Sequence, residues 1–533
     1  MQSWSLTVDK MLTHAARWHP NVEIVSRDAA GVVSRSSYAA IDRRAHQLSS
    51  ALIAGGIAKG DRIATLAMNG SEHVEAWFGI AAMGAVCHTL NPRLFDEQLA
   101  YIINHAGDRW IITDAAFVPS LERVLPGCPR VERVVVIGAA APAPVAGRTT
   151  VGYEAQLQGQ PVDSRWGDFD ENLPAGLCYT SGTTGNPKGV LYSHRTQLLH
   201  TLFASSPEQL GLTARDTALM VVPMFHANAW GVPFATAIAG ARLVLPGPRL
   251  DGESIYGLLE GERVTVTCAV PTVWQLLLDY MRSKDLKLTT LKRVLIGGSA
   301  CSSGLMRAFE SFGVAVNHAW GMTEMSPIGT TGYPSADVEA LPAERRHAQA
   351  LKQGRVGVSV DMKITDDEGN ALPRDGVAAG HIKVKGPCIV GRYFRAEDDA
   401  LDAEGYFDSG DIGSIDEFGY LEITDRSKDV IKSGGEWISS VQIENAAASH
   451  PTALMAAVIG IPDPKWQERP LLLVRLRPGM TATKAEFLAF LEGKIARWWI
   501  PEHILFVDEI PLGATGKIDK KRLRTLYPAA PSA

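Results

Sequence analysis

Residues 178–190 read Cys-Tyr-Thr-Ser-Gly-Thr-Thr-Gly-Asn-Pro-Lys-Gly-Val, and they carry more information than any other part of the chain. An apolar run over residues 175–179 precedes them and Val190-Leu191-Tyr192 follows, so a strand is expected on each side. Glycines let the backbone approach a ligand closely, and consecutive amide N–H groups in such a turn form an anion-binding hollow. Four hydroxyl groups add hydrogen-bond donors, and Lys188 adds a positive charge. The stretch therefore predicts a loop that holds a polyphosphate.

Two other interpretations of this loop are weaker. The P-loop pattern G-x-x-x-x-G-K-[ST] does not fit, because Lys188 follows Asn186-Pro187 and precedes a glycine, which leaves no hydroxyl for a magnesium ion. A plain flexible Ser/Thr/Gly loop is disfavoured by the Pro-Lys-Gly ending and the flanking strands.

The segment from Tyr179 to Gly189 resembles the signature of the AMP-forming acyl-adenylating enzymes, which include acyl-CoA synthetases, luciferases and adenylation domains. In that family the loop grips the β- and γ-phosphates of ATP while a carboxylate attacks the α-phosphate. The resemblance assigns ATP contacts in the loop to Thr180, Ser181, Gly182, Thr183, Thr184, Gly185 and Lys188.

Size and composition set the class of protein. A chain of 533 residues exceeds a single core, and 46% hydrophobic with 21% charged residues is ordinary for a globular protein. A net charge of −6 does not favour a nucleic-acid or membrane-surface partner. Six cysteines without a C-x-x-C pair disfavour a zinc site or a disulfide framework. The N-terminus lacks the apolar core of a signal peptide, and prolines and polar residues interrupt the longest apolar region, 217–241. We expect a cytoplasmic protein without integral membrane association.

The order of patterns along the chain predicts the architecture. Apolar runs alternate with amphipathic helical patterns from about residue 40 to 330, for example a strand at 62–66 followed by a helix at 72–82. This alternation predicts an α/β fold of mostly parallel sheets with helices on both faces. Past residue 355 short alternating strands take over, with a hairpin turn at 416–419, and they predict a small β-barrel-like part.

The charged segment 425–429 lacks any hydrophobic residue and marks the predicted domain boundary. We expect a large N-terminal AMP-binding and acyl-binding domain over 1–424 and a small α+β C-terminal domain over 430–533. By the resemblance, 425–429 is a hinge and the C-terminal domain is mobile.

Five further segments match the family in the expected order, so the resemblance covers roughly residues 20 to 525. The segment 319–324, Ala-Trp-Gly-Met-Thr-Glu, matches the one whose aromatic residue lies on adenine and whose acid binds magnesium. Trp320 offers a flat stacking face, although tyrosine is usual there, and Glu324 is a hard oxygen ligand of the kind that Mg²⁺ prefers. Thr180 is the second magnesium contact that the resemblance implies. The co-substrates it implies are ATP and coenzyme A.

The remaining segments contribute nucleotide contacts and catalytic groups. Asp411 resembles the aspartate that accepts both ribose hydroxyls, and Arg426 should also reach the ribose. The resemblance makes Lys428 the pivot of the hinge, and it makes Lys517 the catalytic lysine whose charge stabilises the transition state of adenylation. The nucleotide contacts implied outside the loop are Ser299, Ala300, Ala319, Trp320, Gly321, Met322, Asp411, Arg426 and Lys428. The catalytic residues implied are Thr323, Glu324, Lys432 and Lys517.

The segment from Met224 to Trp230 resembles that of bacterial medium- and long-chain fatty-acid–CoA ligases, where the tryptophan gates an acyl tunnel. Residues 224–234 contain no Asp or Glu, whereas an amino-acid substrate would need an acid to pair its ammonium group. The acyl-binding residues implied are His226, Ala227, Trp230, Gly297, Gly298 and Trp437.

These observations predict an ATP-dependent ligase that joins a carboxylic acid, by preference a medium-chain fatty acid, to coenzyme A through an acyl-adenylate. Three alternatives stay open. The first is a ligase for a short thioether acid such as 3-methylmercaptopropionate, or for an aryl acid. The others are a fatty acyl-AMP ligase that loads a carrier protein and a nucleotide-binding regulator without chemistry. A homodimer is expected from the relatives of this family alone.

Overall fold

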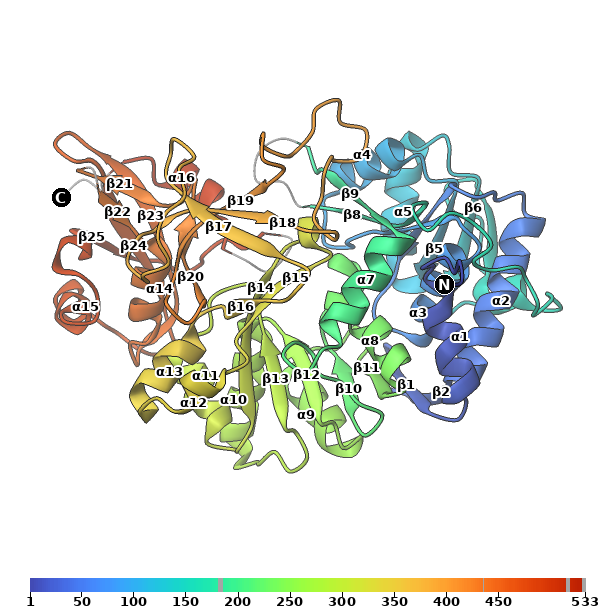
Figure 1. Ribbon diagram of the computed structural model, residues 1–533, viewed down its shortest axis with the longest axis horizontal. Coiled ribbons are helices and arrows are strands. Elements are labelled where there is room, and N and C mark those ends of the chain that lie inside the picture. Colours follow the sequence, from blue (N-terminus) through green and yellow to red (C-terminus); the bar gives the residue numbers. More distant parts are fainter. Residues whose placement is uncertain (181–185, 435, 514–517, 530–533) are drawn as a thin grey trace.

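A computed structural model describes residues 1–180, 186–434, 436–513 and 518–529 (Figure 1). The larger part of the chain contains two mostly parallel sheets. The first has nine strands, in the order β16 (Arg355–Val356), β15 (Ile328–Thr331), β14 (Ala315–Gly321), β13 (Arg293–Ile296), β12 (Val266–Ala269), β10 (Thr217–Met220), β11 (Arg242–Leu245), β1 (Glu23–Arg27) and β2 (Val33–Ser37). The six strands from β14 to β1 are parallel; β2 pairs antiparallel with β1 at one edge, and β15 and β16 add two antiparallel pairings at the other.

The second large sheet has seven strands and ends in an antiparallel hairpin. Its order is β7 (Thr149–Gly152), β6 (Arg133–Ile137), β5 (Trp110–Asp114), β3 (Arg62–Leu66), β4 (Val86–Thr89), β8 (Pro174–Tyr179) and β9 (Gly189–Ser193). All neighbours are parallel except β8 and β9. The strand and helix expected at 62–66 and 72–82 are confirmed as β3 and a helix over 71–82.

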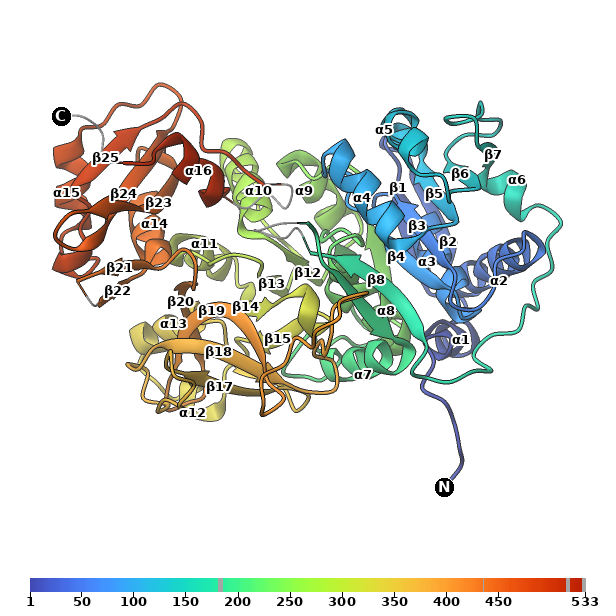
Figure 2. The same cartoon turned by 90° about the horizontal axis from the view of Figure 1, so that it is seen from above.

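Helices cover both large sheets, as the β–α alternation predicted (Figure 2). In this part of the chain they are α1 (Asp9–Trp18), α2 (Tyr38–Ala54), α3 (Ser71–Ala82), α4 (Asp96–Ala106), α5 (Val118–Val124), α6 (Tyr153–Leu157), α7 (His194–Ala204), α8 (Val232–Ala239), α9 (Gly252–Gly261), α10 (Pro271–Lys284), α11 (Ser303–Glu310), α12 (Ala336–Glu339) and α13 (Ala343–Leu351).

The largest hydrophobic core joins the two large sheets. It includes Ile24 and Met220 from the nine-stranded sheet, Ile63 from the seven-stranded sheet, and the aromatic rings of Trp77 on α3 and Phe234 on α8. These two rings lie 4.3 Å apart between their centres. Because aromatic residues bury large apolar areas, this core fixes how the ends of the two sheets face each other.

The expected small β part is a four-stranded antiparallel sheet: β17 (Asp361–Thr365), β18 (Gly380–Lys385), β19 (Phe407–Ile415) and β20 (Leu421–Arg426). The hairpin turn predicted at 416–419 is confirmed between β19 and β20. Gly354 attaches this sheet to the nine-stranded sheet, because its carbonyl accepts a hydrogen bond from Leu421 N at 2.8 Å. This attachment holds the residues of β19 and β20 beside the end of β14.

The C-terminal part is a small α+β domain, as expected. Its sheet has the order β22 (Glu436–Ile438), β21 (Ile431–Ser433), β24 (Gln467–Leu476), β23 (Ala453–Asp463), with β25 (His503–Phe506) parallel to β24. Its helices are α14 (Ser440–Ala448), α15 (Lys484–Leu491) and α16 (Lys520–Leu526). The boundary at 425–429 stays a prediction.

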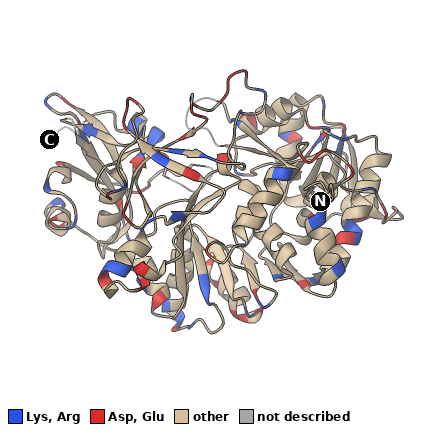
Figure 3. Cartoon of the chain, in the orientation of Figure 1, with Lys and Arg blue, Asp and Glu red and all other residues tan. Residues whose placement is uncertain are grey.

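Two features concern the chain as a whole. Lys and Arg are interspersed with Asp and Glu along the described ribbon (Figure 3). None of the helices in the described ranges combines the length and the apolarity that a membrane crossing requires.

A glycine substitution tests the attachment between the sheets. Gly354 has φ +84°, and a Cβ there would lie 1.9 Å from the carbonyl carbon of Thr331. We expect Gly354→Ala to lower the free energy of unfolding by about 3 kcal/mol or more. The alanine would be strained at this positive φ, and the backbone at Thr331 would also have to move. The control is Gly369→Ala, at φ +89° with open space around it, which should cost about 1 kcal/mol. Equal shifts of the urea midpoint in both variants would contradict this.

Candidate active site

The predicted phosphate loop connects strands β8 and β9 of the antiparallel hairpin. Tyr179 pairs with Gly189 at its base, and Thr180 N donates to the carbonyl of Lys188 at 2.9 Å. A Cβ on Gly189 would lie 3.1 Å from Phe394 and 3.2 Å from Leu177, so a larger residue would crowd the base of the loop. The predicted contacts Ser181, Gly182, Thr183, Thr184 and Gly185 lie outside the described residues. The described ends therefore fix where the loop leaves the sheet and returns to it.

Lys188 and Glu324 meet at the ring of Tyr393. The ammonium group of Lys188 lies 4.8 Å from the ring centre, and the Tyr393 hydroxyl donates to Glu324 Oε1 at 2.8 Å. Burial raises the pKa of Glu324, while the hydrogen bond from Tyr393 and then the charges of Arg426 and Lys188 oppose that shift. The structure thus brings the predicted phosphate lysine and the predicted magnesium ligand into one group.

Thr323 and Glu324 lie in a short 3-10 turn, Thr323–Met325, that follows β14. The hydroxyl of Tyr192 on β9 donates to the carbonyl of Thr323 at 2.7 Å. This hydrogen bond ties the turn to the hairpin that carries the phosphate loop. Tyr192 and Tyr393 were missed by the sequence reasoning, since neither partner is a local neighbour in the chain.

Three predicted nucleotide-binding residues are linked by one hydrogen bond and one ion pair. The indole N–H of Trp320 donates to Asp411 Oδ2 at 2.8 Å, and Arg426 Nε lies 2.7 Å from Asp411 Oδ1. Trp320 and Asp411 are buried, with 8% and 3% of their surface exposed, whereas Arg426 is half-buried. Tyrosine has no ring N–H, so the departure from the family pattern at position 320 supplies the donor of this bond.

The other predicted nucleotide contacts lie near this group or at strand ends. Ala319 and Gly321 belong to β14, and Met322 packs on the core beneath the four-stranded sheet. Ser299 and Ala300 follow the end of β13. Such carboxyl ends of parallel strands are where ligands of open α/β sheets bind.

The predicted acyl-binding residues Trp230, Gly297 and Gly298 are in contact. A Cβ on Gly297 would lie 3.2 Å from the Trp230 ring, and one on Gly298 would lie 3.7 Å from it. His226 and Ala227 belong to the same segment as Trp230, which runs between β10 and α8. The two glycines therefore leave the space that the indole ring occupies.

The predicted hinge and C-terminal residues have other neighbours. Lys432 and Trp437 pair across β21 and β22, and the Trp437 ring lies 6.1 Å from His381 on β18. Lys428 lies in the turn after β20, where its carbonyl accepts a hydrogen bond from Arg524. The structure does not bring Lys432 and Trp437 to Trp230, and Lys517 lies outside the described residues.

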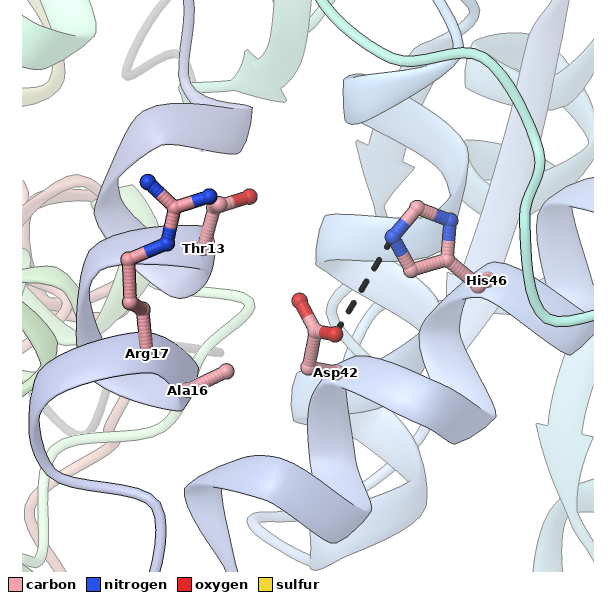
Figure 4. Close-up of a pocket in the computed structure, with 5 residues that line it drawn as sticks. All are labelled: Thr13, Ala16, Arg17, Asp42 and His46. Carbon is pink, nitrogen blue, oxygen red and sulfur yellow. Dashed lines mark ion pairs between the residues drawn. The ribbon is translucent and has the colours of Figure 1, made fainter.

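Two cavities in the described part of the chain lie away from these residues. One, of about 300 Å³, lies between α1 and α2 and contains the Asp42–His46 ion pair at 4.0 Å (Figure 4). The other, of about 740 Å³, is lined by residues such as Thr217 and Arg242 at the amino ends of parallel strands. Neither is lined by a predicted site residue.

A tryptophan substitution tests the Trp320–Asp411 bond. Trp320→Phe keeps an aromatic face but removes the N–H, so Asp411 loses a buried donor, and the ribose contact that is predicted for Asp411 should weaken. We expect the KM for ATP to rise about tenfold and the preference for ATP over 2′-deoxy-ATP to fall.

The control for this test is Trp274→Phe. Trp274 is fully buried, and its indole N–H has no hydrogen-bond partner among the described residues. An unchanged nucleotide preference in Trp320→Phe would contradict the assignment.

Removal of the Tyr393 hydroxyl should change the pH dependence of activity. Because its hydrogen bond lowers the pKa of Glu324, Tyr393→Phe raises that pKa further. The carboxylate is the form that binds a metal, so the activity that is lost on acidification should be lost at a higher pH in the variant than in the parent. The measurement is the pH profile of the pyrophosphate release that requires the carboxylic acid substrate. Tyr256→Phe, which removes an exposed hydroxyl bonded to Lys287, should leave the profile unchanged; the same profile in both variants would be the contrary result.

Comparison with known proteins agrees with this arrangement. The model of the AMP-binding enzyme family matches residues 12–394, and that of the AMP-binding enzyme C-terminal domain matches 442–517. A 3-methylmercaptopropionyl-CoA ligase of Ruegeria pomeroyi is 47% identical, over 98% of this chain and 97% of its own. A medium-chain-fatty-acid–CoA ligase of Ectopseudomonas oleovorans is 44% identical, over 98% and 96%.

Among solved structures, the anthranilate CoA ligase AuaEII in complex with anthranoyl-AMP has a TM-score of 0.88 at 24% identity, covering 98% of both chains. That likeness shows the fold. Both family models and the full-length relatives together place the sequence: the chain belongs to the AMP-binding enzyme family, among its AMP-forming acid–CoA ligases.

Proposed function

We propose that this ligase activates a medium-chain fatty acid. One observation carries the proposal: the Trp230 ring packs on Gly297 and Gly298, in a segment, 224–234, without any carboxylate. An apolar site of this kind gains about 0.8 kcal/mol for each methylene group that it buries. The 44% identical medium-chain ligase supports the same substrate class.

In the first step, a carboxylate oxygen of the acid attacks the α-phosphorus of ATP. A bond forms between that oxygen and phosphorus, the bond from the α-phosphorus to the bridging oxygen breaks, and pyrophosphate leaves. The 180–188 loop and Lys188 hold the β- and γ-phosphates, while Asp411 and Arg426 hold the ribose. Lys517 approaches the α-phosphate, where a cation stabilises the growing charge of the transition state more than the ground state.

Glu324 and Thr180 fit a magnesium ion bound together with the nucleotide. The described residues contain no group of three His, Cys, Asp or Glu that could hold a metal unaided. Mg²⁺ commonly takes one or two carboxylates together with substrate phosphates and water, and Glu324 is a buried carboxylate beside a phosphate-binding lysine. When bound, the ion would neutralise phosphate charge. Tyr393 orients the Glu324 carboxylate through its hydrogen bond.

In the second step, the sulfur of coenzyme A forms a bond to the acyl carbon, the bond from that carbon to the phosphate oxygen of AMP breaks, the thiol proton passes to solvent, and AMP leaves. We propose that the C-terminal domain, 430–533, rotates about Lys428 within the 425–429 hinge, and that Lys432 and Trp437 then contact the acyl-adenylate. The present ring contact of Trp437 with His381 on β18 supports a change of neighbours between the two steps. We retain the homodimer as a proposal.

A short thioether acid is the second candidate substrate. The 47% identical relative is a ligase for 3-methylmercaptopropionate, and a thioether is apolar and polarizable, so the Trp230 segment would suit it. The full-length relatives are CoA ligases, which disfavours the carrier-protein ligase, an enzyme that would not depend on free coenzyme A.

A substrate panel tests these candidates. Purified enzyme with ATP and magnesium is given straight-chain acids of four to sixteen carbons, 3-methylmercaptopropionate and benzoate, with and without coenzyme A, and AMP release is measured. We expect the highest kcat/KM with acids of about eight to ten carbons, and AMP release that requires coenzyme A. A maximum at 3-methylmercaptopropionate would select the thioether substrate. Multiple turnovers without coenzyme A, when a carrier protein is supplied, would select carrier loading.

A further inference from the structure

The segment that carries Trp230 has an unusual backbone. Ala227, Asn228, Ala229 and Trp230 have φ values of +41°, +53°, +53° and +56°, and Gly231 follows at +80°. Residues with a Cβ visit this left-handed region as single residues, and each costs roughly 1–2 kcal/mol. Four in succession form one left-handed turn, which persists when surrounding contacts over-determine it.

Asn228 provides such contacts. Its side chain is 2% exposed; Oδ1 accepts from the indole N–H of Trp77 at 3.2 Å, and Nδ2 donates to Gln197 Oε1 at 3.4 Å. Trp77 lies on α3 and Gln197 on α7, and both are buried. A Cβ on Gly176 of β8 would lie 3.7 Å from Asn228 Nδ2. The amide is therefore held between two helices and the strand that leads into the phosphate loop.

The residues around Asn228 transmit this anchoring to the indole ring. Ala227 and Ala229 are buried with little side chain to hold them, and Ala229 N donates to the carbonyl of His226 at 3.1 Å across the turn. Gly231 lies beside His200 of α7, where a Cβ would be 3.5 Å from the imidazole. Trp230 is half-buried, two residues after the anchor, and it lies against Gly297 and Gly298. The turn that carries the Trp230 ring is thus anchored at Asn228 and packed against α7.

We infer that Asn228 is a positioning residue that fixes Trp230 against Gly297 and Gly298 and thereby sets the chain length of the acid that the enzyme accepts. Asn228 acts through Trp230 and does not contact the reacting atoms. The inference rests on the proposed function, in which Trp230 faces the acyl chain.

The test separates this role from a general contribution to folding. Asn228→Gly removes the hydrogen bonds to Trp77 and Gln197 together with the longer one from Cys178 Sγ at 3.9 Å. Glycine still permits a positive φ, so the variant tests the anchor without adding backbone strain. Gln197→Met keeps the length and volume of the side chain and removes the acceptor of Asn228 Nδ2. Trp274→Phe, in the core on α10, is the matched control for a buried change outside the site.

The measurement is kcat/KM for the straight-chain acids, together with the KM for ATP. In Asn228→Gly, the ratio between the preferred acid and the acid two carbons longer should fall about fivefold. Gln197→Met should lower it less, and the KM for ATP should stay within about twofold of the parent. Trp274→Phe should leave the ratio unchanged.

Two results would overturn the inference, and they can be told apart. Asn228→Gly could lower the melting temperature, or lower kcat by the same factor for every acid, while the kcat/KM ratio between the two chain lengths stays that of the parent. In that case Asn228 has a structural role alone. If the parent itself is inactive on every straight-chain acid, the proposed function fails first, and the inference fails with it.

Discussion

The buried hydrogen bond from Trp320 to Asp411 is the interaction on which the arrangement of the site depends. Trp320 lies next to the last residue of β14 in the nine-stranded sheet, and Asp411 belongs to the four-stranded sheet. The bond therefore joins the face that would receive the adenine to the carboxylate that would receive the ribose. Arg426 occupies the other oxygen of Asp411. Trp320 and Asp411 are both buried, so loss of the indole N–H would leave one oxygen of the Asp411 carboxylate without its donor in the protein interior. Leaving that oxygen unsatisfied costs more than the bond itself contributes.

A second group of residues, Lys188, Glu324 and Tyr393, brings opposite charges together where we propose that the phosphates bind. Lys188 and Glu324 approach opposite parts of Tyr393, one above the ring and one at the hydroxyl. An aromatic ring attracts a cation to its face through its quadrupole, while its hydroxyl donates to a carboxylate. One tyrosine thus keeps a lysine and a glutamate near each other without a direct ion pair, so both charges stay available for a polyphosphate and its metal. Tyr192 holds the backbone of Thr323 to the loop hairpin in the same region.

Local patterns were enough for the parts of the fold that local physics decides. The strand β3, the helix α3 and the hairpin at 416–419 follow from apolar runs, helical periodicity and a glycine turn, which are all short-range signals. Trp320, Asp411, Arg426, Lys188 and Glu324 were also predicted from motifs, and the structure groups them as two contacting sets. Their roles in binding and catalysis remain predictions.

Tyr393 and Asn228 could not be found in this way. Tyr393 lies 69 residues from Glu324, and Asn228 lies 151 residues from Trp77, so each contact is created by tertiary packing. The left-handed turn at 227–230 contains no glycine to announce it. The sequence predicts a stacking role for the Trp320 ring but not the hydrogen bond of its indole N–H, because the partner Asp411 belongs to another sheet.

The most direct test of the central claim is the exchange of labelled pyrophosphate into ATP without coenzyme A. If the enzyme forms an acyl-adenylate from a carboxylic acid and ATP, label should enter ATP when the acid is present and should not when the acid is omitted. Exchange should also vanish in Lys517→Ala. An enzyme that makes the acyl-CoA product but exchanges no label with any acid would contradict the account.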